Sequence, residues 1–169
     1  MENKIVEENI LPERLKAAMR AWITGVAIVT GYHKSRMHGM TANSFNSIAL
    51  SPPTVLVALR RETRTQKLVQ EGGVFAVSVL STTQLELAQR FAGQVDLNQA
   101  RFDGVETFSM ITGAPLIKGA IAYFDCQVVR SIDVGGTSVF LGEVLAAENV
   151  RGDQDPLLYF NREWRRLEK

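Results

Sequence analysis

Short apolar segments, several of them rich in β-branched residues, recur along this chain and are separated by turns or by brief helical patterns. Strands and helices do not alternate regularly enough for a doubly wound parallel sheet. The pattern predicts strands at residues 26–30, 39–50, 54–59, 74–80, 120–130 and 137–147, a hairpin turn at 133–136, and a last short strand pair at 157–160 and 163–167. The expected fold is therefore mainly β, a closed antiparallel barrel with a few peripheral α-helices.

Three segments carry helical patterns, at residues 10–23, 60–71 and 81–91. In the first, leucine, methionine and tryptophan side chains recur at helical spacing, and Pro12 suits the first turn. Gly72 and Gly73 are expected to close the second helix. The third is expected to begin at a serine or threonine N-cap.

One domain is expected across residues 1–169, with residues 1–9 as a loose N-terminal tail. Lysine plus arginine number 19 and aspartate plus glutamate 18, which gives a net charge of +1. This balance argues against nucleic-acid binding and against a polybasic membrane anchor. No segment approaches the ~20 apolar residues of a membrane span, and the N-terminus lacks the apolar core of a signal peptide. With Cys126 as the single cysteine, we expect a soluble cytoplasmic protein without a disulfide or a thiolate metal cluster.

The sequence lacks several motifs that bind nucleotides or activate a serine nucleophile, namely Gly-x-Gly-x-x-Gly, the Walker loop and Gly-x-Ser-x-Gly. Its two histidines, His33 and His38, lie in or beside a turn and form no metal constellation with the cysteine. His33 is expected to be solvated, whereas His38 either flanks a site or lies on the surface. Because the carboxylates are scattered without an evident pair, we expect any catalysis to use an organic cofactor.

Small polar side chains are concentrated at residues 38–47, although the neighbouring strands are apolar. Gly39 and Ala42 would let a flat ring approach the backbone closely. Donors and acceptors for the edge of a polar heterocycle would come from Thr41, Asn43, Ser44 and Ser47. An exposed edge strand also tolerates such residues, so this composition by itself leaves both interpretations open.

Three arginines and two threonines gather at the start of the second predicted helix, namely Arg60, Arg61, Thr63, Arg64 and Thr65. Hydroxyls, guanidinium groups and the free N–H groups of a helix start together form an anion site, and the spacing suits one phosphate. The alternative is a solvated helix start with a threonine N-cap.

A third segment of interest runs from Gln89 to Gly93, with Arg101 and Phe102 after it. Phe91 either anchors the core or forms the wall of a ligand cavity. In the second case, the small residues Ala92 and Gly93 would leave room for a second phosphate or an adenine.

These segments resemble, in order, the short-chain flavin reductase family. That family includes reductase components of two-component flavin-dependent monooxygenases, such as the 4-hydroxyphenylacetate 3-monooxygenase reductase type. The most distinctive match is His38 to Phe45 followed by Ser51-Pro52-Pro53. The other matches are Trp22–Thr30, Thr63–Thr65, Phe75–Leu80, Arg90–Gly93, Phe140–Val144 and Pro156–Phe160. The resemblance covers about residues 15–167, nearly the whole chain.

The resemblance implies a split β-barrel with a Greek-key core, which binds FMN or FAD near the interface of a homodimer. It also implies reduction of the flavin by NADH or NADPH and delivery to a flavin-dependent oxygenase partner. The isoalloxazine and ribityl chain would lie at residues 41–47 and the phosphate at 63–65, while residues 91–93 would border the phosphate or adenine end. The implied flavin-binding residues are Thr41, Ala42, Asn43, Ser44, Phe45, Ser47, Thr63, Arg64, Thr65, Phe91, Ala92 and Gly93.

One position departs from the family pattern. Relatives commonly carry a histidine near the flavin and nicotinamide where this chain has Thr137. A neutral hydroxyl cannot supply positive charge to a reduced flavin anion. The residues proposed to contact the nicotinamide are Thr137, Tyr159 and Arg162. The alternative functions are a tight flavin-binding electron-transfer protein without nicotinamide reductase activity, and a flavin-free small-molecule binder.

Overall fold

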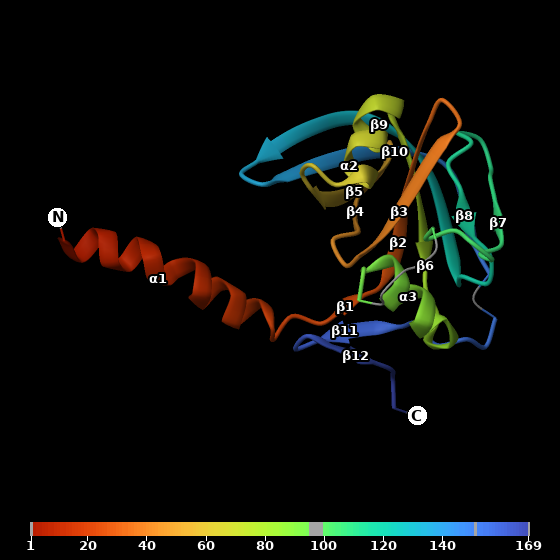
Figure 1. Cartoon of the computed structure of the whole chain (residues 1–169). Coiled ribbons are helices and arrows are strands. Elements are labelled where there is room, and N and C mark those ends of the chain that lie inside the picture. Colours follow the sequence, from red (N-terminus) through yellow and green to blue (C-terminus); the bar gives the residue numbers. More distant parts are fainter. Residues whose placement is uncertain (1, 95–99, 151, 169) are drawn as a thin grey trace.

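The computed structural model describes residues 2–94, 100–150 and 152–168, and it shows a β-rich body from which one helix projects (Figure 1). Helix α1, Glu2–Met19, extends away from the body, whereas α2 (Arg64–Gly72) and α3 (Leu85–Phe91) lie against the strands. A short 3₁₀ helix, η1 (Thr82–Gln84), leads into α3. Among the described helices, none has both the length and the apolar character needed to cross a membrane.

Seven strands form one antiparallel sheet in the order β3-β2-β6-β9-β10-β5-β4. They are β2 (Ala27–His33), β3 (Arg36–Ala42), β4 (Asn46–Leu50), β5 (Pro53–Arg60), β6 (Val74–Val79), β9 (Ala122–Val134) and β10 (Thr137–Asn149). A three-stranded sheet contains β1 (Thr24–Gly25), β11 (Leu158–Phe160) and β12 (Glu163–Arg165), and a two-stranded sheet contains β7 (Thr107–Phe108) and β8 (Leu116–Ile117).

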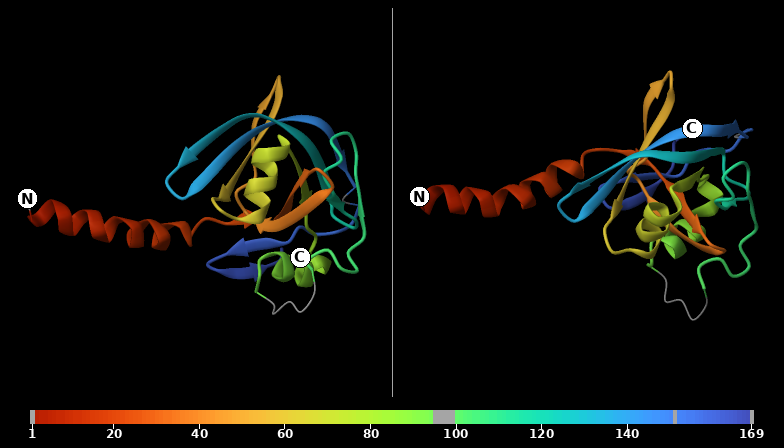
Figure 2. Two further views of the ribbon diagram at one scale, coloured as in Figure 1. Left: turned by 45° about the horizontal axis from the view of Figure 1, so that its top comes forward. Right: turned by 90° about the horizontal axis from the view of Figure 1, so that it is seen from above.

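The two edge strands of the large sheet are joined by a very short connection. Strand β3 ends at Ala42 and β4 begins at Asn46, so residues 43–45 carry the chain from one edge of the sheet to the other. Because four extended residues span at most about 14 Å, the sheet must curl strongly to bring its edges together. Figure 2 shows this curl from two further directions. The mainly β class is thereby confirmed, and the curled but open sheet is compatible with the expected split barrel.

The large sheet carries apolar clusters on both faces, because successive strand residues point to opposite sides. Ala27 and Val29 of β2 belong to one buried cluster, together with Phe75 of β6. Ile28, between them in sequence, belongs to the other cluster, which includes Phe91 of α3. The α3 side of the sheet is thus part of the core, and it places the end of α3 beside β3.

Helix α2 has well-defined ends. The hydroxyl of Thr63 accepts a hydrogen bond from the N–H of Gln66 at 3.3 Å, and this N-cap begins the helix. Gly73 ends it in the left-handed conformation, with φ +67°, and donates its N–H to the carbonyl of Val69. The predicted helix at 60–71 therefore exists, but it begins later because residue 60 belongs to β5.

Several sequence-based boundaries were wrong. The single strand predicted at 39–50 is two strands on opposite edges of the sheet, because the polar alternation continues through the break at 43–45. The hairpin turn between β9 and β10 contains only residues 135–136. The two-residue strands β1, β7 and β8 were not predicted, since they are too short to show a period. Residues 95–99, after α3, lie outside the described residues.

The first helix begins at Glu2 and ends at Met19, although the sequence pattern predicted a loose tail at 1–9 and a helix at 10–23. Half of residues 2–9 are the good helix formers glutamate and lysine, which favours the earlier start, and Met1 lies outside the described residues. Pro12 lies inside the helix instead of in its first turn. Residues 20–22 continue as tighter turns, in which each N–H donates to the carbonyl three residues before it.

Candidate functional site

A cavity of about 770 Å³ lies along the edge strand β3. Its walls come from β3, the segment where β5 passes into α2, the end of α3 with the turn after it, and the β11–β12 hairpin. A volume in this range is typical of pockets for small molecules and cofactors. Because β3 pairs with a neighbour on only one side, its second row of backbone polar groups remains available to a ligand.

The fold brings nine of the residues proposed from the sequence together around this cavity. They are Thr41, Ala42, Asn43, Thr63, Arg64, Thr65, Phe91, Ala92 and Tyr159. They come from four separate parts of the chain, and the packing of α2 and α3 beside β3 makes them neighbours. Sequence segments that were individually ambiguous therefore share one space.

Three residues proposed for the flavin-binding segment do not line the cavity. The Ser44 hydroxyl donates to the carbonyl of Ala58 at 2.7 Å and accepts its N–H at 3.2 Å, so it ties the β3–β4 connection to β5. Phe45 packs against Phe124, with ring centroids 4.9 Å apart. Ser47 is an exposed residue of β4, at the opposite edge of the sheet.

Three further proposed residues also lie outside the cavity wall. Gly93 follows α3 with φ +71°, where a Cβ atom would lie 3.3 Å from the Nη2 atom of Arg101. Thr137 is the first residue of β10 and lies opposite Arg60 of β5. Arg162 is in the turn between β11 and β12, with φ +64°.

Two threonine hydroxyl groups on the cavity wall are already engaged within the protein. Thr41 Oγ1 donates to the carbonyl of Ala88 at 2.6 Å. Thr63 Oγ1 donates to the carbonyl of Arg60 at 2.8 Å while it caps α2. The single O–H of each of these two hydroxyls therefore donates within the protein, and toward a ligand each can act only as an acceptor.

His38 lies at the α2 end of the cavity, and its Nδ1 atom is 2.8 Å from the Oγ1 atom of Thr65. Burial, together with the positive charges of Arg101 and Arg64, lowers the pKa of His38 to about 4. The imidazole is consequently neutral near pH 7. The interpretation of His38 as a residue beside the site is the one that the structure supports.

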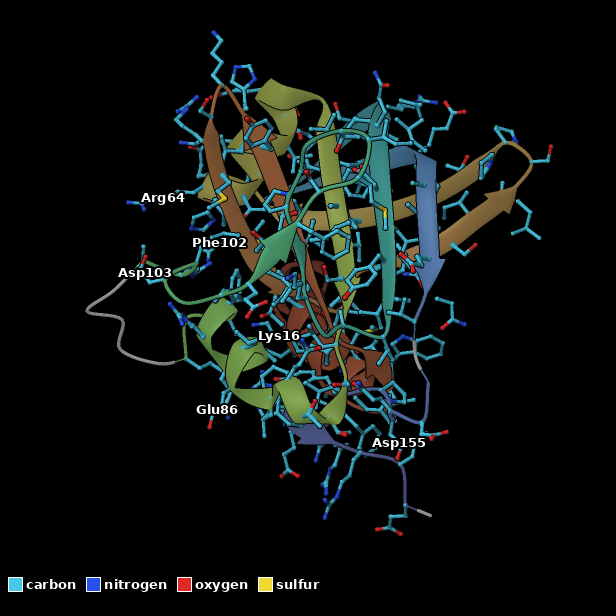
Figure 3. The ribbon with its side chains drawn as sticks, turned by 90° about the vertical axis from the view of Figure 1, so that its right-hand side faces the viewer. Lys16, Arg64, Glu86, Phe102, Asp103 and Asp155 are labelled. Carbon is cyan, nitrogen blue, oxygen red and sulfur yellow. The ribbon has the colours of Figure 1, made fainter. Side chains whose placement is uncertain are left out.

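The same end of the cavity is strongly cationic. Arg60, Arg64 and Arg101 all contribute to its wall, and the described lining residues include no carboxylate. Arg101 donates from Nη1 to the carbonyl of Gly39 at 2.9 Å, which fixes it across β3. Burial lowers the pKa of Arg101, and the charge of Arg64 adds to this. In Figure 3, Arg64 points outward on the same side of the molecule as Phe102.

Aromatic and aliphatic side chains form the remaining walls. Phe91 is 1% exposed, and its ring meets that of Phe102 edge-on, with centroids 5.1 Å apart. At the β11–β12 hairpin, Tyr159 and Trp164 form a second edge-on pair, also at 5.1 Å. Such surfaces suit the flat ring of a heterocycle, whereas the arginines suit phosphate.

Several wall residues were missed or left undecided by the sequence analysis. Arg101 and Phe102 were noted without an assigned position, and the wall residues that were not proposed are Val26, Met37, Met40, Gln94, Ala100 and Trp164. The alternation of β3 places His38 and Met40 on the same face as Ala42, a signal that could have identified them. For the turn after α3 no local signal exists, because its position depends on tertiary packing.

The donor set fits a flavin nucleotide. The free edge of β3 and the Asn43 amide offer donors and acceptors for the polar edge of the ring, and Phe91 with Ala92 offers apolar surface. Arg64 and the start of α2 would hold the phosphate. Among the described residues, no group of three His, Cys, Asp or Glu side chains could hold a metal ion. Fold and site together define a mainly β protein built to bind an anionic ligand with a flat ring.

Comparison with known proteins identifies the family. Residues 19–168 match the model of the flavin reductase like domain, and the chain belongs to this family. It is 39% identical over 131 residues to the NADH-dependent FAD reductase of Streptomyces globisporus, which covers 73% of this chain and 69% of that protein. It is 32% identical over 158 residues to the FMN reductase (NADH) RutF of Stutzerimonas stutzeri strain A1501, with coverage of 94% and 90%.

A solved structure also resembles this one closely. BorF, the flavin reductase component of a bacterial two-component tryptophan halogenase, superposes with a TM-score of 0.83 at 35% identity, covering 94% of this chain and 99% of that one. The chain spans 44% of the length of the probable flavin reductase of Rhizobium meliloti strain 1021, to which it is 35% identical over 139 residues.

Proposed function

We propose that this protein is an NAD(P)H-dependent flavin reductase that reduces FMN or FAD and supplies the reduced flavin to a partner oxygenase. The observation that carries the proposal is the β3 cavity, in which a cationic end and apolar ring-sized walls share one space. The similar proteins support it by their names: two are FAD and FMN reductases that use NADH, and BorF is the reductase component of a two-component enzyme.

The bound flavin supplies the redox chemistry by accepting hydride from the reduced nicotinamide. The residues of the chain then need to bind, orient and shield the ring, because hydride transfer requires no acid or base from the protein. Asn43 and the free edge of β3 are the proposed contacts of the ring edge, while Thr65 and Arg64 are the proposed contacts of the phosphate. Positive charge toward the ring comes from the arginines, since His38 is neutral.

For the nicotinamide we propose the surface formed by Tyr159 and Trp164. Both line the cavity, and their aromatic rings offer the flat contact area that a nicotinamide needs. Thr137 and Arg162 remain weaker candidates, because neither contributes to the cavity wall of the single chain.

We also propose a homodimer. Helix α1 projects away from the body in Figure 1, and Leu11, Leu15 and Met19 on it, with Trp22 just after it, expose between 54% and 65% of their surface. An isolated helix of this length is marginal in water, so packing against a second copy would supply its missing stabilisation. We further propose a single domain across residues 1–169. We also propose a cytoplasmic location, because reduced nicotinamide nucleotide is the electron source.

The proposal is tested by mixing the full-length protein with NADH or NADPH and with FMN or FAD, and following the loss of nicotinamide absorbance. We expect flavin-dependent oxidation with at least one of the four pairs. Absence of oxidation with every pair, in a protein that binds flavin, would eliminate the reductase activity.

The second candidate function is a tight flavin-binding electron-transfer protein. It is favoured by one observation, namely that Thr137, where the family resemblance implies a histidine, has only a neutral hydroxyl and lies outside the cavity wall. A purified protein that retains yellow flavin through gel filtration, and that dithionite reduces but neither nucleotide does, would support this candidate over the reductase.

A further inference from the structure

A turn that follows α3 is fixed to that helix by hydrogen bonds. Arg90 donates through Nη2 to the carbonyl oxygens of Ala100, at 2.7 Å, and Asp103, at 2.8 Å. The N–H of Ala100 donates to Oδ2 of Asp103 at 3.1 Å, which closes the turn on itself. The two residues between them, Arg101 and Phe102, are therefore presented to the cavity by a braced piece of backbone.

Arg101 reaches across the cavity from this turn to the opposite strand. One of its guanidinium nitrogens, Nη1, donates to the carbonyl of Gly39 in β3. A guanidinium carries five N–H donors, and among the described residues Arg101 hydrogen-bonds only to Gly39. Most of its donors are thus available to an anion. The side chain is held at its base by the braced turn and at its guanidinium by the Gly39 carbonyl.

The positive charge at this end exceeds what one phosphate needs. Arg60 is the last residue of β5 and Arg64 the first of α2, whereas Arg101 comes from the turn after α3. No described lining residue carries a negative charge. A flavin monophosphate placed at the start of α2 would engage the first two arginines. A second anionic group would find its partner in Arg101, which the Gly39 carbonyl holds in place beside Arg64.

An aromatic surface lies directly beside that third arginine. Phe102 follows it in the turn, and the edge-on contact with Phe91, at an interplanar angle of 87°, holds the Phe102 ring in a defined orientation. A partly buried ring next to a phosphate-binding guanidinium is the arrangement that an adenine nucleotide uses, because the base stacks while the diphosphate is neutralised.

We propose that Arg101 and Phe102 make this protein selective for FAD over FMN: Arg101 binds the second phosphate of the flavin dinucleotide and Phe102 packs against its adenine. This inference rests on the proposed flavin reductase function and specifies its substrate. The same adenosine diphosphate group also occurs in NADH, and the proposal commits to the flavin as its source.

The test measures the dissociation constants of riboflavin, FMN and FAD by flavin fluorescence titration of the full-length protein. We expect FAD to bind at least about tenfold more tightly than FMN, since one charge-assisted contact contributes about that factor. Arg101→Gln should weaken FAD binding by about tenfold or more and change FMN binding by less than about threefold. Arg101→Lys, which keeps the charge but loses the planar set of donors, should fall between these values.

Arg61→Gln is the matched control. Arg61 is adjacent to the cationic end but outside the cavity wall, and its exposed side chain lies 3.7 Å from Asp133. Arg61→Gln removes the same positive charge near the site as Arg101→Gln does. A general electrostatic effect would therefore weaken FAD binding in both variants. Selective loss in Arg101→Gln alone, with unchanged thermal unfolding, supports the direct contact.

The outcomes separate this inference from the proposed function. If FMN and FAD bind equally, or if Arg101→Gln weakens both equally, the selectivity is refuted while NADH oxidation leaves the reductase proposal intact. If Arg101→Gln raises the KM for NADH at saturating FMN and leaves the FAD to FMN ratio unchanged, the diphosphate belongs to the nicotinamide nucleotide and the inference is wrong. If no flavin binds and no NADH is oxidised, both proposals fall.

Discussion

The Nδ1 atom of His38 in β3 lies 2.8 Å from the Oγ1 atom of Thr65 in α2, so the imidazole joins two elements across the cationic end of the cavity. Burial among the surrounding side chains, together with the charges of Arg101 and Arg64, lowers the pKa of His38 from 6.5 to about 4. The histidine thus serves the fold as a neutral hydrogen-bonding group, and the positive charge of the site is left to the arginines.

This relationship predicts a pH dependence of stability. Between about pH 4 and pH 6.5 the unfolded chain binds a proton at His38 that the folded chain does not, so the free energy of unfolding should rise with pH across this window. In His38→Gln that part of the slope should be absent. Urea unfolding at several pH values across the window measures it, and His33→Gln, which changes the other histidine, should keep the slope. An unchanged slope in His38→Gln would show that other groups cause it.

The N-cap of α2 predicts a second effect, because the Thr63 hydroxyl is engaged at both its donor and its acceptor side. Thr63→Ala should lower the free energy of unfolding by about 1 kcal/mol, whereas Thr63→Ser, which keeps the hydroxyl, should stay close to the natural protein. Urea unfolding of the two variants decides between them. Equal stability of both variants would mean that the cap contributes little.

Adjacent residues of the β3–β4 connection should respond in opposite ways to removal of their polar groups. Asn43 lines the cavity, whereas both polar sides of the Ser44 hydroxyl are bonded to Ala58. Asn43→Ala should weaken flavin binding by about tenfold with little loss of stability. Ser44→Ala should lower the free energy of unfolding by about 1 kcal/mol and leave flavin affinity within about twofold. Fluorescence titration and urea unfolding of both variants are the measurements, and weaker flavin binding in Ser44→Ala would restore Ser44 to the site.

Features of this fold that depend on neighbouring residues are predictable from the sequence, whereas contacts between distant segments are not. Strands such as β2 and β6 are predictable because their β-branched residues and flanking turns are local. The break between two strands after Ala42 is not predictable. Alternation of side chains shows which face of a sheet a residue occupies, but it does not show which strand lies beside it. The contact between the residues around His38 and those around Thr65 depends on α2 packing beside β3, which local patterns do not encode.

The candidate site divides along the same line. Residues 41–43 belong to the segment 38–47, which was identified because its polar residues stood out against apolar strands. Residues 63–65 were identified from the arginines and threonines at a predicted helix start. Ser44 belonged to the same run in sequence, yet its side chain turns to β5 for hydrogen bonds. Arg101 has no local signal for its role, because its partner Gly39 is 62 residues away in the chain.

The exposed stripe of α1 provides the last prediction, which concerns assembly. Leu15 is 60% exposed on a helix that stands apart from the body, so a glutamate there costs nothing in the monomer but must be buried in the proposed homodimer (Figure 1). Leu15→Glu should weaken dimerisation by about tenfold or more, as expected for loss of one buried leucine. Ala17→Glu adds the same charge on the opposite face of the helix and should leave the dimer intact. Sedimentation equilibrium of the natural protein and both variants provides the test. A monomeric natural protein would refute the dimer, and equal dimerisation of all three proteins would show that α1 is not its interface.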